Sequence, residues 1–468
     1  MGDDSVDGVG DRSSPHASLL CNVPVRPFPT YDDLDPSSFL TKHVHSNTPF
    51  LLSQKATASW PARRIWVNSS GTAGHPSSRF IPSHPGRAGG GPGPSLVRGF
   101  NDAVSGSSSS TTTTTSSSSS STVSRPNLAA LSAYADQTVP VANTSMREFS
   151  EFERDEVPLG QVLASWDKHE GVALYVKDWH LVAELEARGS PGSEVYTPPP
   201  CFRDDWLSPP FDTGGSGSHS RDMGSPPTTC TSTADFRFVY LGPAGTFTPL
   251  HRDVYGSYSW SANIVGRKVW WLFPPGVEKD LVDRHGNLLF DIRGHPNASK
   301  GVKILQEEGE VLFVPSGWHH QVVNVDFCIS INHNFFSSPT LPRVYAALRA
   351  SQARCAASID DVKVDIRTRL GDQRLADGTL AWEAEFAEEV EGLLARDAGW
   401  GWTGFWECIR DNLARPPAPP EFSAPPEERA RSIREVMQLY KESPQWTLLP
   451  ATRGLVNLVE TLLEAGSS

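Results

Sequence analysis

The fold of this chain is decided by residues 259–274, which read SWSANIVGRKVWWLFP. Two runs rich in aromatic and β-branched residues, Ser259–Val265 and Lys268–Phe273, are separated by a Gly-Arg pair and followed by Pro274. Short apolar runs that are bounded by glycine and proline are typical of β-strands. The stretch therefore predicts two consecutive strands.

The same pattern extends outward from this pair and covers residues 236–336. Six further short strands are expected, at Phe236–Leu241, Leu250–Asp253, Val302–Leu305, Val311–Val314, His320–Val325 and Cys328–Asn334. Eight short strands at this spacing predict a mainly β fold with some α, built on a double-stranded β-helix, the jelly roll of cupin type. The alternative is an immunoglobulin-like sandwich, but the chain lacks the Cys, Trp and Cys spacing of that fold.

Helical patterns flank the expected jelly roll on both sides, because apolar residues recur there three and four positions apart. The expected N-terminal additions are helices at Leu128–Tyr134 and Leu159–Trp166 and a strand at Val172–Val176. The expected C-terminal helices are Leu341–Cys355, Leu380–Leu394, Thr403–Leu413, Pro426–Tyr440 and Leu455–Leu463.

Composition divides the chain into segments. The composition of residues 1–22 predicts a disordered tail, and that of residues 23–67 predicts the N-terminal part of the folded domain. Residues 68–127 are dominated by Gly, Pro, Ser and Thr, which cannot bury enough apolar surface to offset the entropy of ordering, so this segment predicts a low-complexity insertion. Residues 128–338 then carry the jelly-roll domain, and residues 339–468 a helical region.

The charge and the cysteines exclude several classes of protein. The 468 residues include 41 Lys and Arg against 54 Asp and Glu, a formal charge of −13. This balance argues against a nucleic-acid or membrane binder and is compatible with a protein substrate, although solubility alone also explains it. The six cysteines form no C-x-x-C pair, so their spacing indicates neither a zinc site nor a disulfide framework. No apolar run approaches the roughly 18 residues of a membrane span. The acidic N-terminus has no apolar signal segment, so we expect a cytoplasmic protein, with the nucleus as a further location.

A candidate metal site begins at residues 248–253, which read TPLHRD. Strand residues i and i+2 face the same side, so His251 and Asp253 can offer a nitrogen and a carboxylate oxygen to one ion. The run PSGWHH at 315–320 supplies a third ligand, and two histidines with one carboxylate form the facial triad of non-haem Fe(II) oxygenases. Adjacent residues face opposite ways, so spacing leaves open whether His319 or His320 is the ligand. A His-x-Asp pair by itself is more often a surface turn.

Lys268 opens a strand of large apolar residues and is therefore expected to point into a pocket. A buried ammonium needs an anionic partner, which the distal carboxylate of 2-oxoglutarate would supply. The alternative is an edge lysine that protects the strand from aggregation. Thr248 could donate its hydroxyl to the same carboxylate, although a solvated hydroxyl at a strand start explains it equally well.

Three of these runs resemble the JmjC domain: HRD at 251–253, GRKVWWLFP at 266–274 and VPSGWHHQV at 314–322. Two further runs, LYVKDWHL at 174–181 and SINHN at 330–334, resemble the JmjC lysyl hydroxylases that act on eukaryotic translation termination factor 1. The resemblance covers residues 23–67 and 128–340 and extends more loosely into the C-terminal helices. The Ser-rich insertion departs from the family pattern, but it precedes every motif.

The resemblance implies a set of site residues, with no catalytic side chain beyond the metal centre. The implied Fe(II) ligands are His251, Asp253 and His320. His320 is preferred to His319 because it ends the Pro-x-x-Trp-x-His pattern of the family. The implied 2-oxoglutarate contacts are Tyr175, Thr248, Lys268 and Asn334.

The resemblance also implies an activity, that of a 2-oxoglutarate-dependent dioxygenase that hydroxylates a lysine of a protein. Termination factor 1 is the expected partner, with no direct nucleic-acid or membrane contact. Three alternatives stay open: an N-methyl-lysine demethylase, a hydroxylase of another residue such as Asn or Arg, and a non-catalytic cupin-fold interaction protein. Asp178, Asp204 and Asp205 could select a substrate lysine, but sequence does not rank them, and a solvated surface charge is the simpler interpretation of each.

Overall fold

The computed structural model describes residues 28–68, 124–208, 235–415 and 420–465. The predicted disordered tail lies outside these ranges, and so does nearly all of the predicted insertion. On either side of residues 69–123, β3 (Val67–Asn68) and β4 (Arg125–Pro126) form a short antiparallel pair. All of the described residues belong to one structural unit.

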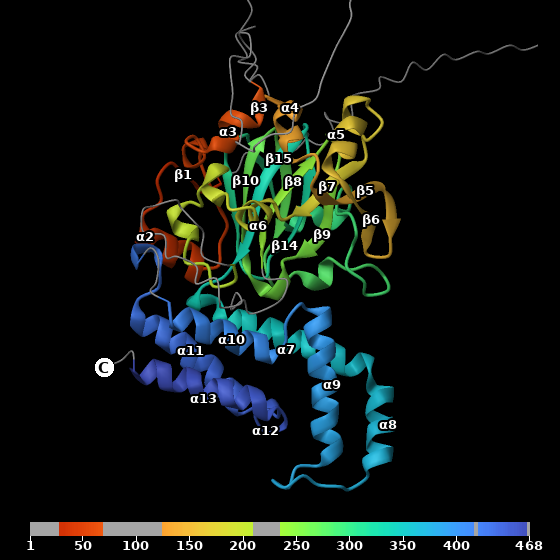
Figure 1. Cartoon of the computed structure of the whole chain (residues 1–468), viewed down its shortest axis with the longest axis vertical. Helices are drawn as coiled ribbons and strands as arrows, with labels where there is room; N and C mark the ends of the chain where they lie inside the picture. Colours follow the sequence, from red (N-terminus) through yellow and green to blue (C-terminus); the bar gives the residue numbers. More distant parts are fainter. Residues whose placement is uncertain (1–27, 69–123, 209–234, 416–419, 466–468) are drawn as a thin grey trace, which may run out of the picture. The chain divides into compact units, whose positions relative to one another are not determined.

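Two sheets form the jelly roll (Figure 1). Their strands, as far as the structure describes the chain, are β1 (Thr30–Tyr31), β2 (Phe50–Leu52), β5 (Thr138–Glu148), β6 (Glu151–Pro158), β7 (Leu174–Trp179), β8 (Arg237–Gly242), β9 (Phe247–Arg252), β10 (Tyr258–Val265), β11 (Lys268–Phe273), β12 (Val302–Gln306), β13 (Val311–Val314), β14 (His319–Asn324) and β15 (Cys328–Phe335). The larger sheet has the order β1-β2-β13-β10-β15-β8-β7-β5-β6, and the smaller sheet has the order β12-β11-β14-β9. The predicted jelly roll is confirmed.

All eight predicted strands of the jelly roll are present. Lys268–Phe273 and Val311–Val314 have the predicted bounds, and most other ends differ by one or two residues. One difference bears on the site: β9 ends at Arg252, so the prediction that placed Asp253 inside the strand is wrong by one residue. Asp253 instead precedes a 3₁₀ turn, Val254–Gly256, and it keeps an extended backbone with φ −57° and ψ 147°.

The turn between β10 and β11 explains the glycine of the deciding stretch. Gly266 has φ +76°, in the left-handed region that favours glycine. A Cβ atom at this position would lie 2.3 Å from the carbonyl oxygen of Phe327. The turn therefore requires glycine, and it directs the chain from the larger sheet into the smaller one, where Lys268 follows at once.

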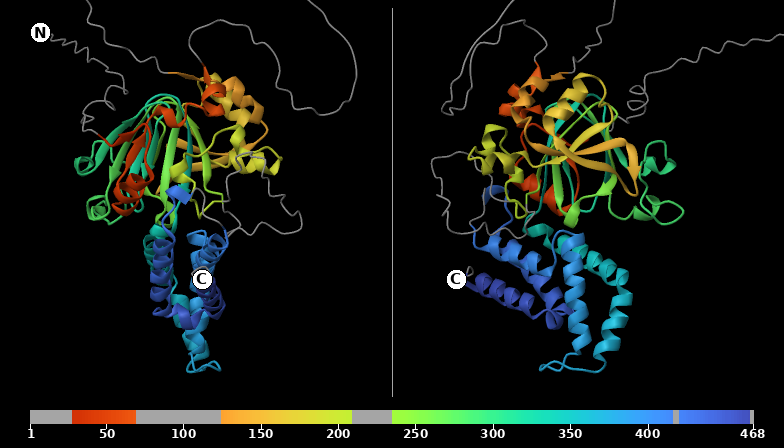
Figure 2. Two further views of the ribbon diagram at one scale, coloured as in Figure 1. Left: turned by 90° about the vertical axis from the view of Figure 1, so that its left-hand side faces the viewer. Right: turned by 45° about the vertical axis from the view of Figure 1, so that its right-hand side comes forward.

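The β5–β6 hairpin was not predicted. It extends the larger sheet at its edge and forms the orange ribbon at the side of the jelly roll in the right-hand view of Figure 2. Most side chains of β6 are exposed, and charged residues dominate the strand. Without an alternation of buried and exposed residues, the sequence carries no clear strand signal here.

Helices flank the jelly roll on both sides of the sequence. The N-terminal helices are α2 (Pro36–Ser38), α3 (Pro61–Ile65), α4 (Leu128–Leu131), α5 (Leu159–Asp167) and α6 (Leu181–Ala187). The C-terminal helices are α7 (Leu341–Ser358), α8 (Asp360–Leu370), α9 (Ala381–Asp397), α10 (Trp402–Leu413), α11 (Pro426–Lys441), α12 (Gln445–Leu448) and α13 (Pro450–Ala465). All of the predicted helices are present, but α8 was missed, because Ile366 is its only buried residue. No helix within the described ranges is long and apolar enough to span a membrane.

The two faces of the larger sheet differ in chemistry, and this difference places the site. One face packs against the N-terminal elements; Trp260 of β10, for example, stacks on Phe202 with ring centroids 5.8 Å apart. Burial of such a side chain is worth roughly 1.5–3 kcal/mol. The opposite face is polar along β10 and β15, whose alternate residues are Ser259, Ser261, Ser330, Asn332 and Asn334. A polar face turned toward the second sheet indicates a ligand site between the sheets.

The C-terminal helices contact the jelly roll close to that site. The ring of Trp400 packs on Tyr255, two residues after Asp253, with centroids 4.6 Å apart. Tyr255 has φ +60°, an uncommon conformation for a residue that is not glycine. The helical region therefore helps to hold the turn that follows Asp253.

Candidate metal centre

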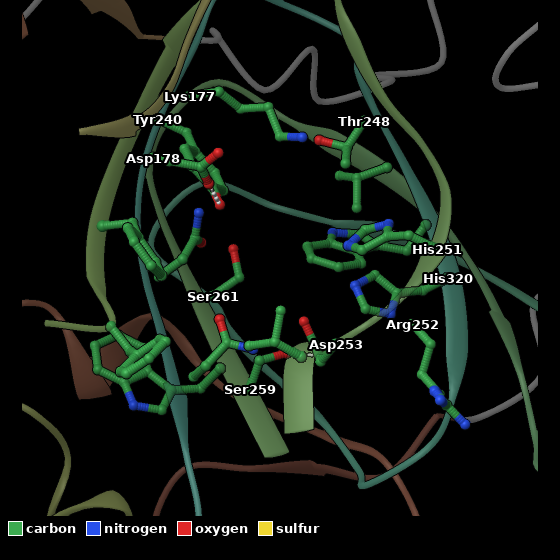
Figure 3. A pocket seen from close by; sticks show the side chains of 18 of the residues that line it. Lys177, Asp178, Tyr240, Thr248, His251, Arg252, Asp253, Ser259, Ser261 and His320 are labelled. Atoms are coloured by element: carbon green, nitrogen blue, oxygen red, sulfur yellow. Dashed lines mark hydrogen bonds between the residues drawn. The ribbon is translucent and has the colours of Figure 1, made fainter. Parts of the chain in front are cut away.

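His251, Asp253 and His320 lie together on the wall of a cavity between the sheets (Figure 3). One ligand atom from each residue lies within 4.8 Å of the other two. His251 and His320 are direct partners across β9 and β14, and their ring centroids are 4.2 Å apart. The cross-strand register therefore brings together residues that are about seventy positions apart in the sequence. Two nitrogens and one carboxylate oxygen suit a ferrous ion.

Hydrogen bonds set the orientation of both imidazoles. Nδ1 of His251 lies 2.8 Å from the carbonyl oxygen of Pro249, and Nδ1 of His320 lies 3.3 Å from that of Trp318. A carbonyl oxygen only accepts, so each Nδ1 carries the proton and each Nε2 keeps its lone pair. Burial, with a contribution from the His320 ring, lowers the pKa of His251 to about 3. A neutral imidazole is the form that binds a metal ion.

Ser259 orients the carboxylate. Its hydroxyl donates a 2.7 Å hydrogen bond to Oδ2 of Asp253 from the polar face of β10. Asn334 stands opposite Ser259 on β15, and its amide donates to the hydroxyl of Ser257 at 3.2 Å. Groups that hydrogen-bond to ligands fix their direction and raise metal affinity. The donor set and its supporting contacts thus fit an iron site.

The sheet geometry separates the two adjacent histidines. His319 pairs with Arg252 and lies outside the three-residue cluster. Burial, with repulsion from Arg252, lowers the pKa of His319 to about 4. His319 therefore faces away from the cluster, as strand alternation requires for a neighbour of His320.

This difference predicts opposite outcomes for two alanine variants. We expect purified His319→Ala to retain iron at the wild-type ratio of metal to protein, and His320→Ala to lose most of it, because only His320 offers a nitrogen to the cluster. Metal analysis after dialysis, together with circular dichroism, measures both. An exchange of the two results would make His319 the ligand.

The cavity beside the cluster has a volume of about 280 Å³. Its wall includes all four predicted 2-oxoglutarate contacts, Tyr175, Thr248, Lys268 and Asn334. The structure therefore brings the predicted metal ligands and the predicted co-substrate contacts to one cavity.

Lys268 points into this cavity, as its place in the sequence predicted. Its side chain is buried, and Nζ donates a 2.8 Å hydrogen bond to Oγ of Ser330. Among the described residues, no carboxylate forms an ion pair with it, and burial lowers its pKa to about 8. Two further oxygens of the cavity, Oγ of Ser261 and Oδ1 of Asn332, are buried without a hydrogen-bond partner in that same part of the chain. Buried polar atoms without a hydrogen-bond partner, beside a buried cation without a carboxylate, indicate a site for a polar ligand.

The low pKa of Lys268 predicts that 2-oxoglutarate affinity depends on pH. Below about pH 8 the ammonium is charged and attracts a carboxylate; above it the amine is neutral. We therefore expect the affinity of the Mn(II)-loaded protein to fall as pH rises from 7 to 9, by up to about tenfold per unit above the pKa. Calorimetry under nitrogen measures this. In Lys268→Arg, which stays charged, the fall should disappear; an equal fall in this variant would assign the titration to another group.

The structure ranks the three acidic candidates for substrate selection. Only Asp178 lines the cavity. Asp204 accepts a hydrogen bond from the indole of Trp206, and Asp205 accepts two from backbone amides, so both serve the local chain. His333 lies between Asn332 and Asn334 on β15 and faces the other side of the sheet, where it bonds to the hydroxyl of Tyr196 and stacks on Trp260.

Several lining residues were not predicted from the sequence. Lys177, Tyr240, Ser259 and Ser261 all line the cavity. In the run SWSAN at 259–263, polar and apolar residues alternate. This alternation is the signal from which the two serines could have been predicted to share one face of the strand. Lys177 and Asp178 are adjacent and still share one cavity, which a regular strand does not allow, so no periodic pattern could have found both.

Residues 238–335 match the family described as "JmjC domain, hydroxylase". This segment is a JmjC domain. It contains all three clustered ligands, and the match confirms the resemblance of these motifs to the JmjC domain.

Whole-chain comparisons extend beyond the JmjC domain. A Gallus gallus protein named 2-oxoglutarate and iron-dependent oxygenase JMJD4 is 37% identical over 251 residues, which are 50% of this chain and 54% of the relative. A Danio rerio protein of the same name is 31% identical over 344 residues, 69% of this chain and 64% of that relative. An Arabidopsis thaliana protein named arginine-specific demethylase JMJ20 is 37% identical over 251 residues, 51% of this chain and 53% of the relative. The chain thus spans between about half and two thirds of the length of these relatives. The expected cofactors agree with the names of the first two.

Proposed function

We propose that this protein is an Fe(II)- and 2-oxoglutarate-dependent oxygenase that hydroxylates a lysine side chain of another protein. One observation carries the proposal: the His251, Asp253 and His320 cluster shares a cavity with a buried lysine that has no carboxylate partner in the described ranges. The metal ligands and the cation for an anionic co-substrate are then both present. The JMJD4 relatives, whose names include both cofactors, support the same activity.

The protein's own residues have defined tasks in this reaction. When bound, iron with 2-oxoglutarate and O₂ supplies oxidative decarboxylation to succinate and CO₂, coupled to the hydroxylation of a C–H bond. His251, Asp253 and His320 would hold the metal on one side and leave the cavity side open. Lys268 and the hydroxyl of Thr248 would orient the co-substrate through its distal carboxylate. The walls would exclude bulk water, which strengthens these charge interactions.

For the substrate, we propose a lysine of translation termination factor 1, on the resemblance of the LYVKDWHL and SINHN runs to that group of lysyl hydroxylases. A cytoplasmic location, predicted from the sequence, is part of the same proposal. The similarity to JMJ20 favours a second candidate, demethylation at nitrogen of a methylated side chain. Hydroxylation of an N-methyl group uses the same site, so the two candidates differ in the substrate and not in the metal centre.

The test is succinate release by the iron-loaded protein with 2-oxoglutarate, with and without recombinant termination factor 1, followed by mass spectrometry of the factor. His251→Ala protein is the matched control. We expect factor-stimulated succinate and one added oxygen atom on a lysine peptide. Succinate without modification of the factor would remove this substrate, and methylated peptides would then test demethylation. No succinate from protein that binds iron would favour the non-catalytic alternative.

A further inference from the structure

The chain departs from regular strand geometry in β7, beside the cavity. Val176 pairs with Leu241 and Trp179 pairs with Val239, so two residues of β7 stand opposite the single residue Tyr240. This is a β-bulge, which locally redirects side chains. Asp178, in the bulge, has φ +65°.

The bulge turns two adjacent charged residues toward the cavity. Val176 and Trp179 remain in the apolar core, whereas Lys177 and Asp178 both line the cavity. Asp178 is held in place: its carboxylate accepts from the hydroxyl of Tyr240 at 2.5 Å and from Nη1 of Arg154 at 3.0 Å. Backbone strain of order 1–3 kcal/mol persists where the surroundings enforce it, and it clusters at functional sites.

Lys177, in contrast, has only charge interactions without hydrogen bonds, with Glu151 and with the adjacent Asp178. Its side chain is 10% exposed, and its nearest carboxylate oxygen, on Glu151, is 3.9 Å away. In the part of the chain that the structure describes, its three N–H donors form no hydrogen bond. Burial of an ammonium group without hydrogen-bond acceptors costs free energy, unless a ligand supplies those acceptors.

The direction of Lys177 shows where such a ligand would lie. Figure 3 shows its ammonium end pointing across the cavity toward the hydroxyl of Thr248. Lys177, Thr248 and the three clustered ligands line the same cavity. The ammonium therefore faces the cavity of the metal cluster from the side of Thr248.

We propose that Lys177 is a second co-substrate-binding cation, whose ammonium contacts a carboxylate of 2-oxoglutarate from the larger sheet while Lys268 contacts the co-substrate from the smaller sheet. The inference rests on the proposed function. A dicarboxylate between Thr248 and the metal ligands would supply the acceptor that Lys177 lacks. Asp178 is a positioning residue, because its bonds to Tyr240 and Arg154 hold the bulge that directs Lys177 inward.

The experiment measures 2-oxoglutarate binding and not turnover. The full-length Mn(II)-loaded protein is titrated with 2-oxoglutarate by calorimetry under nitrogen, as wild type, Lys177→Met and Lys177→Arg. We expect Lys177→Met to bind at least tenfold more weakly and Lys177→Arg to stay within about threefold of wild type. If Lys177→Met does not fold, Lys177→Gln tests the same charge.

Lys168→Met is the control, because it removes one positive charge from a lysine that neither lines the cavity nor contacts the bulge. Its side chain is exposed, so 2-oxoglutarate affinity should stay within about twofold. Mn(II) affinity should be unchanged in Lys177→Met.

Unchanged 2-oxoglutarate affinity in Lys177→Met would overturn the assignment, and a raised KM for the protein substrate in that variant would then place Lys177 against the substrate. Failure of the wild type to bind 2-oxoglutarate would instead remove the proposed function itself, so the two failures are distinct.

Discussion

Replacing His251 or Asp253 with alanine is expected to abolish succinate release while leaving the fold intact. Loss of a group that only supports a metal ligand already costs roughly 10- to 100-fold in affinity or activity. Removal of a ligand itself should therefore lower turnover by more than about 100-fold. The fold should persist because neither His251 nor Asp253 belongs to an apolar core cluster of the jelly roll, such as the one around Trp260.

Three measurements separate loss of chemistry from loss of structure. Succinate release gives the activity, metal analysis gives the iron content, and thermal unfolding gives the stability. We expect a change in melting temperature within about 4 °C, the shift that corresponds to roughly 1 kcal/mol in a domain of this size. His285→Ala, which alters an exposed histidine outside the cluster, should match wild type in all three. Wild-type turnover in either ligand variant would remove the metal assignment.

Lys268→Met is expected to raise the KM for 2-oxoglutarate by about 30-fold or more, with a smaller effect on the KM for the protein substrate. Removal of one partner from a buried charge pair typically costs 2–5 kcal/mol, because the other charge is left without compensation. In the free protein the same change should be neutral or stabilising, because the buried ammonium is already costly there, as its lowered pKa indicates.

Lys268→Met should therefore weaken 2-oxoglutarate binding without lowering the stability of the free protein. This combination makes the prediction specific. Ser330→Ala is the matched control, because it removes only the hydroxyl that accepts from Lys268. One hydrogen bond to a neutral partner contributes about 0.5–1.5 kcal/mol, so the KM for 2-oxoglutarate should rise by no more than roughly tenfold. If Lys268→Met destabilised the free protein and left the KM for 2-oxoglutarate unchanged, Lys268 would be a structural residue.

The sequence by itself determined the local features of this protein. Strand runs such as Lys268–Phe273 follow from apolar patterning and from glycine and proline at their ends, which are properties of neighbouring residues. His251 and Asp253 could be paired for the same reason, because two positions along an extended chain return to one face. The burial of Lys268 was predictable from the apolar residues that follow it.

Only the tertiary structure decided the features that depend on pairing between distant strands. The sequence alone left His319 and His320 open, and the family resemblance favoured His320; the register between β9 and β14 places His320 opposite His251. The bulge at Asp178 exists because β7 gains a residue relative to β8, a relation that no periodic pattern within β7 records. The sequence alone therefore did not identify Lys177 as a residue of the site. Local periodicity fixes which residues form strands, whereas register and bulges fix which side chains meet, and the site depends on both.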